Sequence, residues 1–286
     1  MKGLFGRRKR RKRRRTAFLK TVLVFMLVFL CVRYSPVLYS KISSDFCFTK
    51  NSESAPVFVA HRGLSGMFPQ NTTVAFEKAD EYGFFGYEFD IHTTKDGKWV
   101  VIHDDTVDKM TDGEGNVEDF TFEEIRKLKI DAGNGIENYP DLKVPTLEEA
   151  LEFCKTSDIV PVIEIKKCNT ALLPALKVTL DEYSLSERAV IISFDKEYLE
   201  EYRKFDKDIK MLYLSHQPSK EDIDWCVANN VGINYNHHNF YKCLGVLKYA
   251  REKGITIGAW TVDSTILCDI AVLLGAEIIT TNKILP

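Results

Sequence analysis

Short apolar runs alternate with helical patterns along most of this chain. Helical periodicity predicts helices at 72–83, 146–156, 170–183, 196–205, 219–230, 240–253 and 264–274. The apolar runs before and between them are Val57–Ala60, Tyr87–Ile91, Val160–Ile165, Ala189–Phe194, Lys210–Leu214, Val231–Tyr235, Thr256–Val262 and Glu277–Thr281. Because strands that are apolar throughout are typical of parallel sheets buried on both faces, this alternation predicts an α/β fold, a (β/α)8 TIM barrel over residues 55–286.

The second apolar run carries two acids in a pattern that suggests chemistry. Glu88 and Asp90 alternate with apolar residues, so a strand would place both carboxylates on one face. An Asp-Gly turn at 96–97 predicts a β-hairpin whose return brings His103 back beside the acids. Carboxylates facing an imidazole suit a divalent cation with an acid or base beside it. The alternative, an exposed acidic edge, is disfavoured by the apolar opposite face.

Reactive residues also follow other predicted strands, as the catalytic end of such a barrel requires. His61 and Arg62 follow the first strand, and an arginine there can hold a phosphate by two parallel hydrogen bonds. Glu164 and Lys166 end the third strand and Trp260 the seventh. Structural alternatives are a strand cap, a surface ion pair and a core tryptophan. The histidines away from predicted strand ends are interpreted as structural or exposed: His92, His216, His237 and His238.

A long segment, 105–145, follows the hairpin and exceeds an ordinary connection inside a barrel. It contains the turn-forming stretch 111–115 and one short amphipathic helix at 122–128. An insertion after strand 2, over the catalytic face, is expected to be a lid or a substrate-recognition element.

The first 33 residues are not expected to belong to the barrel. Nine consecutive basic residues, Arg7–Arg15, precede the apolar stretch Thr16–Val32. This predicts a basic cytoplasmic N-terminus at 1–15, a transmembrane helix at 16–33 and a linker at 34–54. The positive-inside rule then predicts a single-pass protein of the cell membrane whose catalytic domain is extracytoplasmic.

Two alternatives to an uncleaved anchor remain. A cleaved signal peptide would fit the apolar stretch, but no clear small-x-small cleavage site follows it. A nuclear-localisation or nucleic-acid-binding arm would fit the basic run, but it gives no reason for the apolar stretch beside that run.

Charge is distributed unevenly, and this narrows the class of partner. Residues 1–33 hold 12 of the 39 Lys and Arg and no acid, so residues 34–286 carry a net charge of −14. Such a domain repels phosphate chains, which argues against nucleic acid and favours a small-molecule substrate.

Taken in order, these motifs resemble the glycerophosphodiester phosphodiesterase family of TIM-barrel phosphodiesterases over nearly all of residues 57–286. The resemblance rests on His61-Arg62-Gly63, Pro69-Gln70-Asn71-Thr72, Glu88-Phe89-Asp90, Lys95-Asp96-Gly97, His103-Asp104, Pro145–Ala150, Glu164-Ile165-Lys166, Trp260-Thr261-Val262 and Gly275–Asn282. Two positions depart from the family pattern. Gln70 stands where an acid is usual, which puts in doubt a role in tuning histidine basicity or contacting the metal, and Thr281 stands where an aspartate is common.

The resemblance implies a metal site, a proton-transfer pair and phosphate contacts. It implies that one divalent cation, Ca²⁺ or Mg²⁺, is held by Glu88, Asp90 and Glu164. It further implies that the acid/base pair is His61 and His103, and that the phosphate oxygens are contacted by Arg62 and Lys166, with Trp260 a further substrate contact.

The expected function is therefore hydrolysis of glycerophosphodiesters, the deacylated phospholipids, to sn-glycerol 3-phosphate and an alcohol. Whether water or the glycerol 2-hydroxyl attacks phosphorus stays open at this point. A lysophospholipase D-type hydrolase is one alternative, because the anchor would give access to lipid. The other is a non-catalytic phosphodiester-binding barrel, and Gln70 is the only residue that favours it.

Overall fold

The computed structural model describes residues 55–286. The predicted basic N-terminus at 1–15, transmembrane helix at 16–33 and linker at 34–54 lie outside the described residues. None of the helices between residues 55 and 286 has the length and apolar character needed to cross a membrane.

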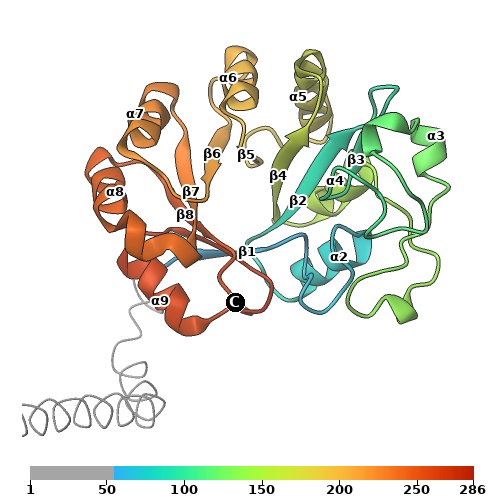
Figure 1. Cartoon of the computed structure of the whole chain (residues 1–286), viewed down its shortest axis with the longest axis horizontal. Coiled ribbons are helices and arrows are strands. Elements are labelled where there is room, and N and C mark those ends of the chain that lie inside the picture. The colour runs from blue at the N-terminus through green and yellow to red at the C-terminus, as the bar shows by residue number, and fades with distance from the viewer. Residues whose placement is uncertain (1–54) are drawn as a thin grey trace, which may run out of the picture. The chain divides into compact units, whose positions relative to one another are not determined.

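Eight parallel strands form a closed barrel, as the sequence predicts (Figure 1). The sheet order is β1-β9-β8-β7-β6-β5-β4-β2-β3, and a pairing of β1 with β2 closes the ring. The parallel strands are β1 (Val57–Ala60), β2 (Gly86–Thr93), β4 (Val160–Lys167), β5 (Val190–Ser193), β6 (Lys210–Ser215), β7 (Gly232–Asn236), β8 (Ile257–Trp260) and β9 (Ile278–Thr281).

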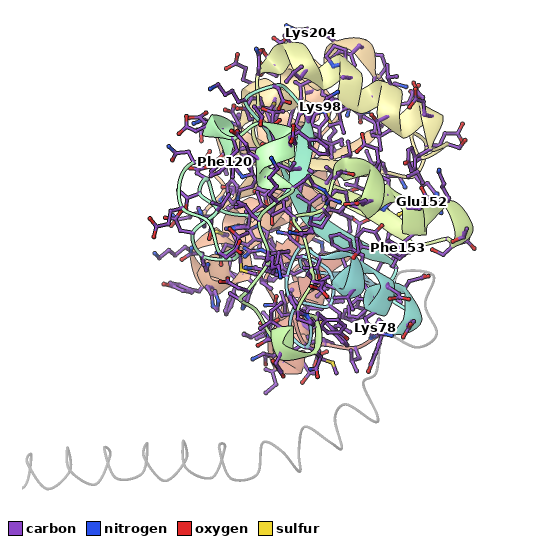
Figure 2. All side chains as sticks on the ribbon, turned by 90° about the vertical axis from the view of Figure 1, so that its right-hand side faces the viewer. Lys78, Lys98, Phe120, Glu152, Phe153 and Lys204 are labelled. Carbon is purple, nitrogen blue, oxygen red and sulfur yellow. The ribbon has the colours of Figure 1, made fainter. Side chains whose placement is uncertain are left out.

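The helices lie around this ring, and their starts follow from capping residues. Thr146 and Ser219 each form a capping box with the acid three residues later, which fixes the first turns of α4 and α7. The α-helices are α2 (Thr73–Glu81), α3 (Phe122–Ile125), α4 (Leu147–Thr156), α5 (Leu173–Glu182), α6 (Lys196–Phe205), α7 (Lys220–Asn229), α8 (Phe240–Lys253) and α9 (Thr265–Leu273). Lys78, Glu152 and Lys204 project outward from α2, α4 and α6 (Figure 2).

Alternation along the strands sorts side chains between the barrel interior and the helix layer. Val59, Val162, Ile192 and Leu212 belong to one buried cluster that fills the interior, whereas Phe89 and its outward neighbours pack in the larger cluster against the helices. Both strand faces are thus buried, which explains why the strands read as apolar throughout. The interior face of β2 therefore holds its two acids.

The hairpin and the insertion form a separate layer beside β2. Strand β3 (Trp99–Val101) pairs antiparallel with β2, as predicted, and ends two residues before His103. The predicted helix at 122–128 is a single turn, and the segment packs around its own small core, which comprises Val100, Ile102, Val107, Met110, Val117, Ile125, Ile130 and Val144. The role of this insertion as a lid or recognition element stays a prediction.

Candidate active site

Three carboxylates meet at the carboxyl ends of β2 and β4. Glu88 and Asp90 lie on β2, and the parallel register pairs Asp90 with Glu164 on β4. All three side chains are buried, and each offers a carboxylate oxygen within 4.8 Å of the other two. Period-two alternation therefore places these acids together, as predicted from the sequence.

The electrostatics of this cluster favour a bound cation. Burial, and then the charges of Asp90 and Glu164, raise the pKa of Glu88 well above its ordinary value. Burial followed by the charge of Asp90 raises the pKa of Glu164 to about 7. Glu88 Oε1 and Asp90 Oδ1 are buried without a hydrogen-bond donor among the described residues. Hard divalent cations bind carboxylate oxygens, so this donor set fits a Ca²⁺ or Mg²⁺ ion.

Two cationic side chains border the carboxylates. Lys166 Nζ lies 2.8 Å from Glu164 Oε1 and 3.9 Å from Asp90 Oδ1. Arg62 Nε lies 3.5 Å from Asp90 Oδ2, and the Arg62 backbone amide donates to Glu88 Oε2 at 2.7 Å. Both cations are therefore placed where they could neutralise the oxygens of a phosphate beside the carboxylates.

The position of Arg62 depends on an unusual turn after β1. Arg62 has a φ of 56° and Gly63 a φ of 72°, so two successive residues adopt the left-handed conformation. A Cβ on residue 63 would lie 2.7 Å from the backbone of Ala75, so this position requires glycine. The tight turn directs the Arg62 backbone amide to Glu88.

Gln70 forms side-chain hydrogen bonds to Arg62 and Met110, and none to a histidine or a carboxylate is found among the described residues. Its Oε1 accepts a hydrogen bond from Arg62 Nη1 at 2.6 Å, and its Nε2 donates to Met110 Sδ at 3.0 Å. The neighbouring Asn71 donates from Nδ2 to Asp90 Oδ2 at 2.8 Å. In this geometry, Gln70 orients the guanidinium through a neutral hydrogen bond. Its described hydrogen bonds give no support to a role in tuning histidine basicity or contacting a metal, which the sequence already puts in doubt.

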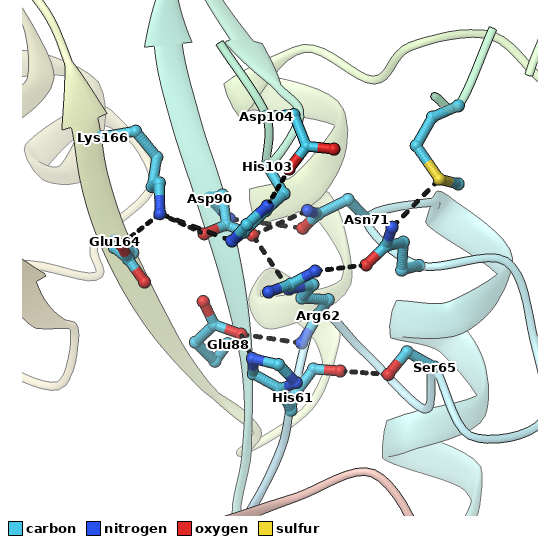
Figure 3. A network of polar contacts seen from close by, with 12 residues as sticks. His61, Arg62, Ser65, Asn71, Glu88, Asp90, His103, Asp104, Glu164 and Lys166 are labelled. Carbon is cyan, nitrogen blue, oxygen red and sulfur yellow. Dashed lines mark hydrogen bonds and ion pairs between the residues drawn. The ribbon is translucent and has the colours of Figure 1, made fainter. Parts of the chain in front are cut away.

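The two histidines present one ring nitrogen each to this cluster (Figure 3). His61 Nδ1 lies 2.8 Å from Asn282 Oδ1, and its Nε2 lies 4.0 Å from Glu88 Oε2. His103 Nδ1 lies 2.5 Å from Asp104 Oδ1, and its Nε2 lies 3.5 Å from Lys166 Nζ. Nδ1 of each ring faces an oxygen, so a proton on Nδ1 would donate to that oxygen and leave Nε2 as the basic nitrogen.

The surroundings of both imidazoles favour the neutral form. Burial and the Arg62 charge lower the pKa of His61 to about 4. Burial likewise lowers the pKa of His103, with the charges of Arg62 and Lys166 acting in the same direction. A neutral imidazole with a free Nε2 can accept a proton, which is the first requirement of a general base.

A cavity joins the predicted site residues. It is lined by His61, Arg62, Glu88, His103, Glu164, Lys166 and Trp260 together with Phe194 and other residues. Asp90 does not line it but lies near both bordering cations. Trp260 is partly exposed and borders the cavity. Its indole Nε1 donates to the Asn234 backbone carbonyl at 3.1 Å, so this N–H group already has a hydrogen-bond acceptor within the protein. The structure therefore brings all eight predicted residues into one region.

His216 is exposed and His237 is buried, in keeping with their interpretation as structural or exposed, but both lie closer to strand ends than the sequence predicts. His216 directly follows β6, because that strand runs one residue further than predicted, and His237 likewise directly follows β7. The His216 ring stacks on Phe194 at a centroid distance of 5.0 Å and packs edge-on to Trp260 at 5.3 Å. His216 thus belongs to an aromatic group beside the cavity. A strand boundary placed one residue later would have indicated it.

Comparisons with known proteins identify the family of this chain. A model of the glycerophosphoryl diester phosphodiesterase family matches residues 61–285. A glycerophosphodiester phosphodiesterase of Caldanaerobacter subterraneus subsp. tengcongensis is 37% identical over 211 residues, which cover 72% of this chain and 85% of that protein. Glycerophosphodiester phosphodiesterase 1 of Homo sapiens is 33% identical over 238 residues, covering 72% of this chain and 71% of that protein.

Solved structures share the barrel. An Oleispira antarctica phosphodiesterase in complex with the product sn-glycerol-3-phosphate has a TM-score of 0.73 at 22% identity, covering 79% of this chain and 93% of that one. A glycerophosphodiester phosphodiesterase of Parabacteroides distasonis has a TM-score of 0.68 at 25% identity, covering 81% and 94%. From the family match, the curated relatives and the assembled site, this chain belongs to the glycerophosphoryl diester phosphodiesterase family and is a phosphoric diester hydrolase.

Proposed function

We propose that this enzyme hydrolyses glycerophosphodiesters to sn-glycerol 3-phosphate and an alcohol, in a metal-dependent reaction at the membrane. The observation that carries the proposal is the arrangement of two imidazoles and two cations around three buried carboxylates. The product bound by the Oleispira antarctica phosphodiesterase supports the glycerol phosphate side of the substrate.

The chain's own residues supply proton transfer and charge. In an in-line displacement, one neutral imidazole accepts the proton of the attacking oxygen at Nε2. The other ring donates to the leaving alcohol oxygen in the fraction of the enzyme in which that ring carries an added proton. Arg62 and Lys166 bind the phosphate oxygens and neutralise the charge that develops on them. Burial of the cavity strengthens these interactions by excluding water.

Glu88, Asp90 and Glu164 would hold the divalent cation, Ca²⁺ or Mg²⁺. When bound, such an ion supplies Lewis-acid charge to a phosphoryl oxygen. A cation held by these acids would offset their buried negative charge, and Arg62 and Lys166 beside the same carboxylates would then favour phosphate binding.

The substrate assignment is tested by product identification with the full-length enzyme. Glycerophosphocholine, glycerophosphoethanolamine and the corresponding lysolipids are each supplied with Ca²⁺ or Mg²⁺, with and without chelator. We expect sn-glycerol 3-phosphate from the deacylated diesters and loss of turnover with chelator. Faster turnover of lysolipids would assign a lysophospholipase D activity instead, and no turnover of any diester would refute the proposal.

We further propose that residues 16–33 anchor the enzyme as a single-pass protein with its N-terminus cytoplasmic and its barrel extracytoplasmic. The nine-residue basic run before the apolar stretch supports this orientation. The full-length protein is expected to stay in the membrane fraction after a high-salt wash, with the barrel accessible to protease from the outer side. A shortened, soluble form in the medium would show cleavage instead.

A further inference from the structure

A chain of hydrogen bonds leads from His61 to a carboxylate outside the predicted site. Asn282, directly after β9, faces His61 Nδ1 with its Oδ1 at 2.8 Å. Asn282 Nδ2 donates to Asp263 Oδ2 at 2.8 Å, and the Asn282 backbone amide donates to Asp263 Oδ1 at 2.7 Å. Asp263 lies in the loop between β8 and α9, so three strand ends contribute to this chain.

Asp263 sets the direction, donor to acceptor, of the hydrogen bonds that link it through Asn282 to His61. Burial alone would raise the pKa of Asp263, but hydrogen bonds from Asn282 and then Thr281 outweigh it and lower the pKa below the ordinary value. An ionised carboxylate only accepts hydrogen bonds, so the group of Asn282 that faces it must be the NH₂ group. The Asn282 carbonyl oxygen then necessarily faces His61.

We infer that Asp263 and Asn282 are positioning residues that hold His61 in the tautomer with its proton on Nδ1. An amide oxygen only accepts, so it keeps the Nδ1 proton in place and leaves the Nε2 lone pair free toward the carboxylate cluster. This inference rests on the proposed role of His61 in proton transfer. It also assigns a partner to Thr281, the departure at β9, whose hydroxyl donates to Asp263 Oδ1 at 3.2 Å.

Replacing Asp263 with asparagine tests the direction of the hydrogen bonds among Asp263, Asn282 and His61. Residue 282 offers two donors to residue 263, and an asparagine side chain there has one acceptor group and one donor group. Whichever way the new side chain turns, one donor of Asn282 loses its acceptor, and rotation of the Asn282 amide would turn NH₂ toward His61 Nδ1. We expect kcat to fall by about 10² to 10⁴, the cost of a wrong histidine tautomer in a related arrangement, with a smaller change in KM.

The double variant Asp263→Asn with Asn282→Asp exchanges the two side chains and should again give every donor among residues 61, 263 and 282 an acceptor. The asparagine side chain then accepts from the backbone amide of residue 282 and donates to the new carboxylate, whose other oxygen accepts the His61 Nδ1 proton. We therefore expect kcat of the double variant to recover most of the loss. Asp206→Asn is the control, because Asp206, like Asp263, is a loop aspartate whose carboxylate accepts backbone amide hydrogen bonds, but it lies at the opposite end of the barrel.

The direct measurement is ¹⁵N NMR of histidine-labelled full-length enzyme in detergent, with thermal unfolding as the check on folding. The chain has six histidines, and the His61 signals are assigned by their loss in His61→Ala. We expect Nδ1 protonated in the unaltered enzyme, a shift toward Nε2 protonation in Asp263→Asn, and reversal in the double variant. An Nδ1-protonated ring in folded Asp263→Asn, or a folded double variant without recovery, would overturn the inference. Full activity of His61→Ala would instead refute the proposed proton transfer.

Discussion

Glu88→Gln is expected to abolish most of the activity and to weaken divalent-cation binding. The amide keeps the shape of the side chain but loses its charge, and a hard cation depends on full carboxylate charge. Glu88 Oε1 is buried and has no hydrogen-bond donor among the described residues, so removal of its charge removes a ligand and little else. Calorimetric titration with Ca²⁺ and Mg²⁺, beside turnover of a glycerophosphodiester, measures both effects.

Glu149→Gln is the matched control for this prediction. Glu149 also accepts a backbone amide hydrogen bond, from Thr146 at 3.0 Å, but it lies in the first turn of α4 on the helix layer. Cation affinity and kcat should be unchanged in this variant, whatever it costs in thermal stability. If Glu88→Gln bound the cation as tightly as the unaltered enzyme, Glu88 would not be a ligand, and the metal site described above would be wrong.

Replacing His61 or His103 with alanine is expected to lower kcat by about 10² to 10⁴, the usual contribution of a positioned proton-transfer group. KM should change less, because Arg62 and Lys166, the proposed phosphate contacts, are still present. The double variant should lose less than the product of the two single losses, since residues that act in one step are not additive.

Steady-state kinetics of the three variants and of His238→Ala check this expectation. His238 is exposed and follows β7, so its removal controls for loss of an imidazole near the same end of the barrel. Near-native kcat in His103→Ala would show that the loop after β3 is structural. The second proton-transfer group would then have to be another residue beside the cavity, and His216 would be the first to test.

Most of the fold and of the carboxylate cluster could be predicted from the periodicity of the strands. Glu88, Asp90 and Glu164 converge because alternation fixes their face, and because neighbouring parallel strands place their carboxyl ends together. Apolar runs bounded by capping residues located the elements to within a few residues. The position of His216 beside the cavity was not predicted, because the predicted end of β6 was one residue too early.

Contacts between distant loops could not be predicted in the same way. His61 and Asn282 are 221 residues apart in sequence, and they meet only because β9 pairs with β1. A local sequence pattern does not predict which side chains of two distant loops contact each other. The role of Gln70 was missed for the same reason, since the direction of the Arg62 side chain follows from an unusual turn at φ 56°.

The pairing of β1 with both β2 and β9 has a consequence for biosynthesis. A nascent chain that has emerged from the ribosome up to Trp260 already contains the three carboxylates and both imidazoles. It lacks β9, so the first strand has an open edge, and Asn282 has not yet been added beside His61. We therefore expect a chain that ends before β9 to be inactive, because its barrel stays open at β1 and His61 lacks the contact with Asn282.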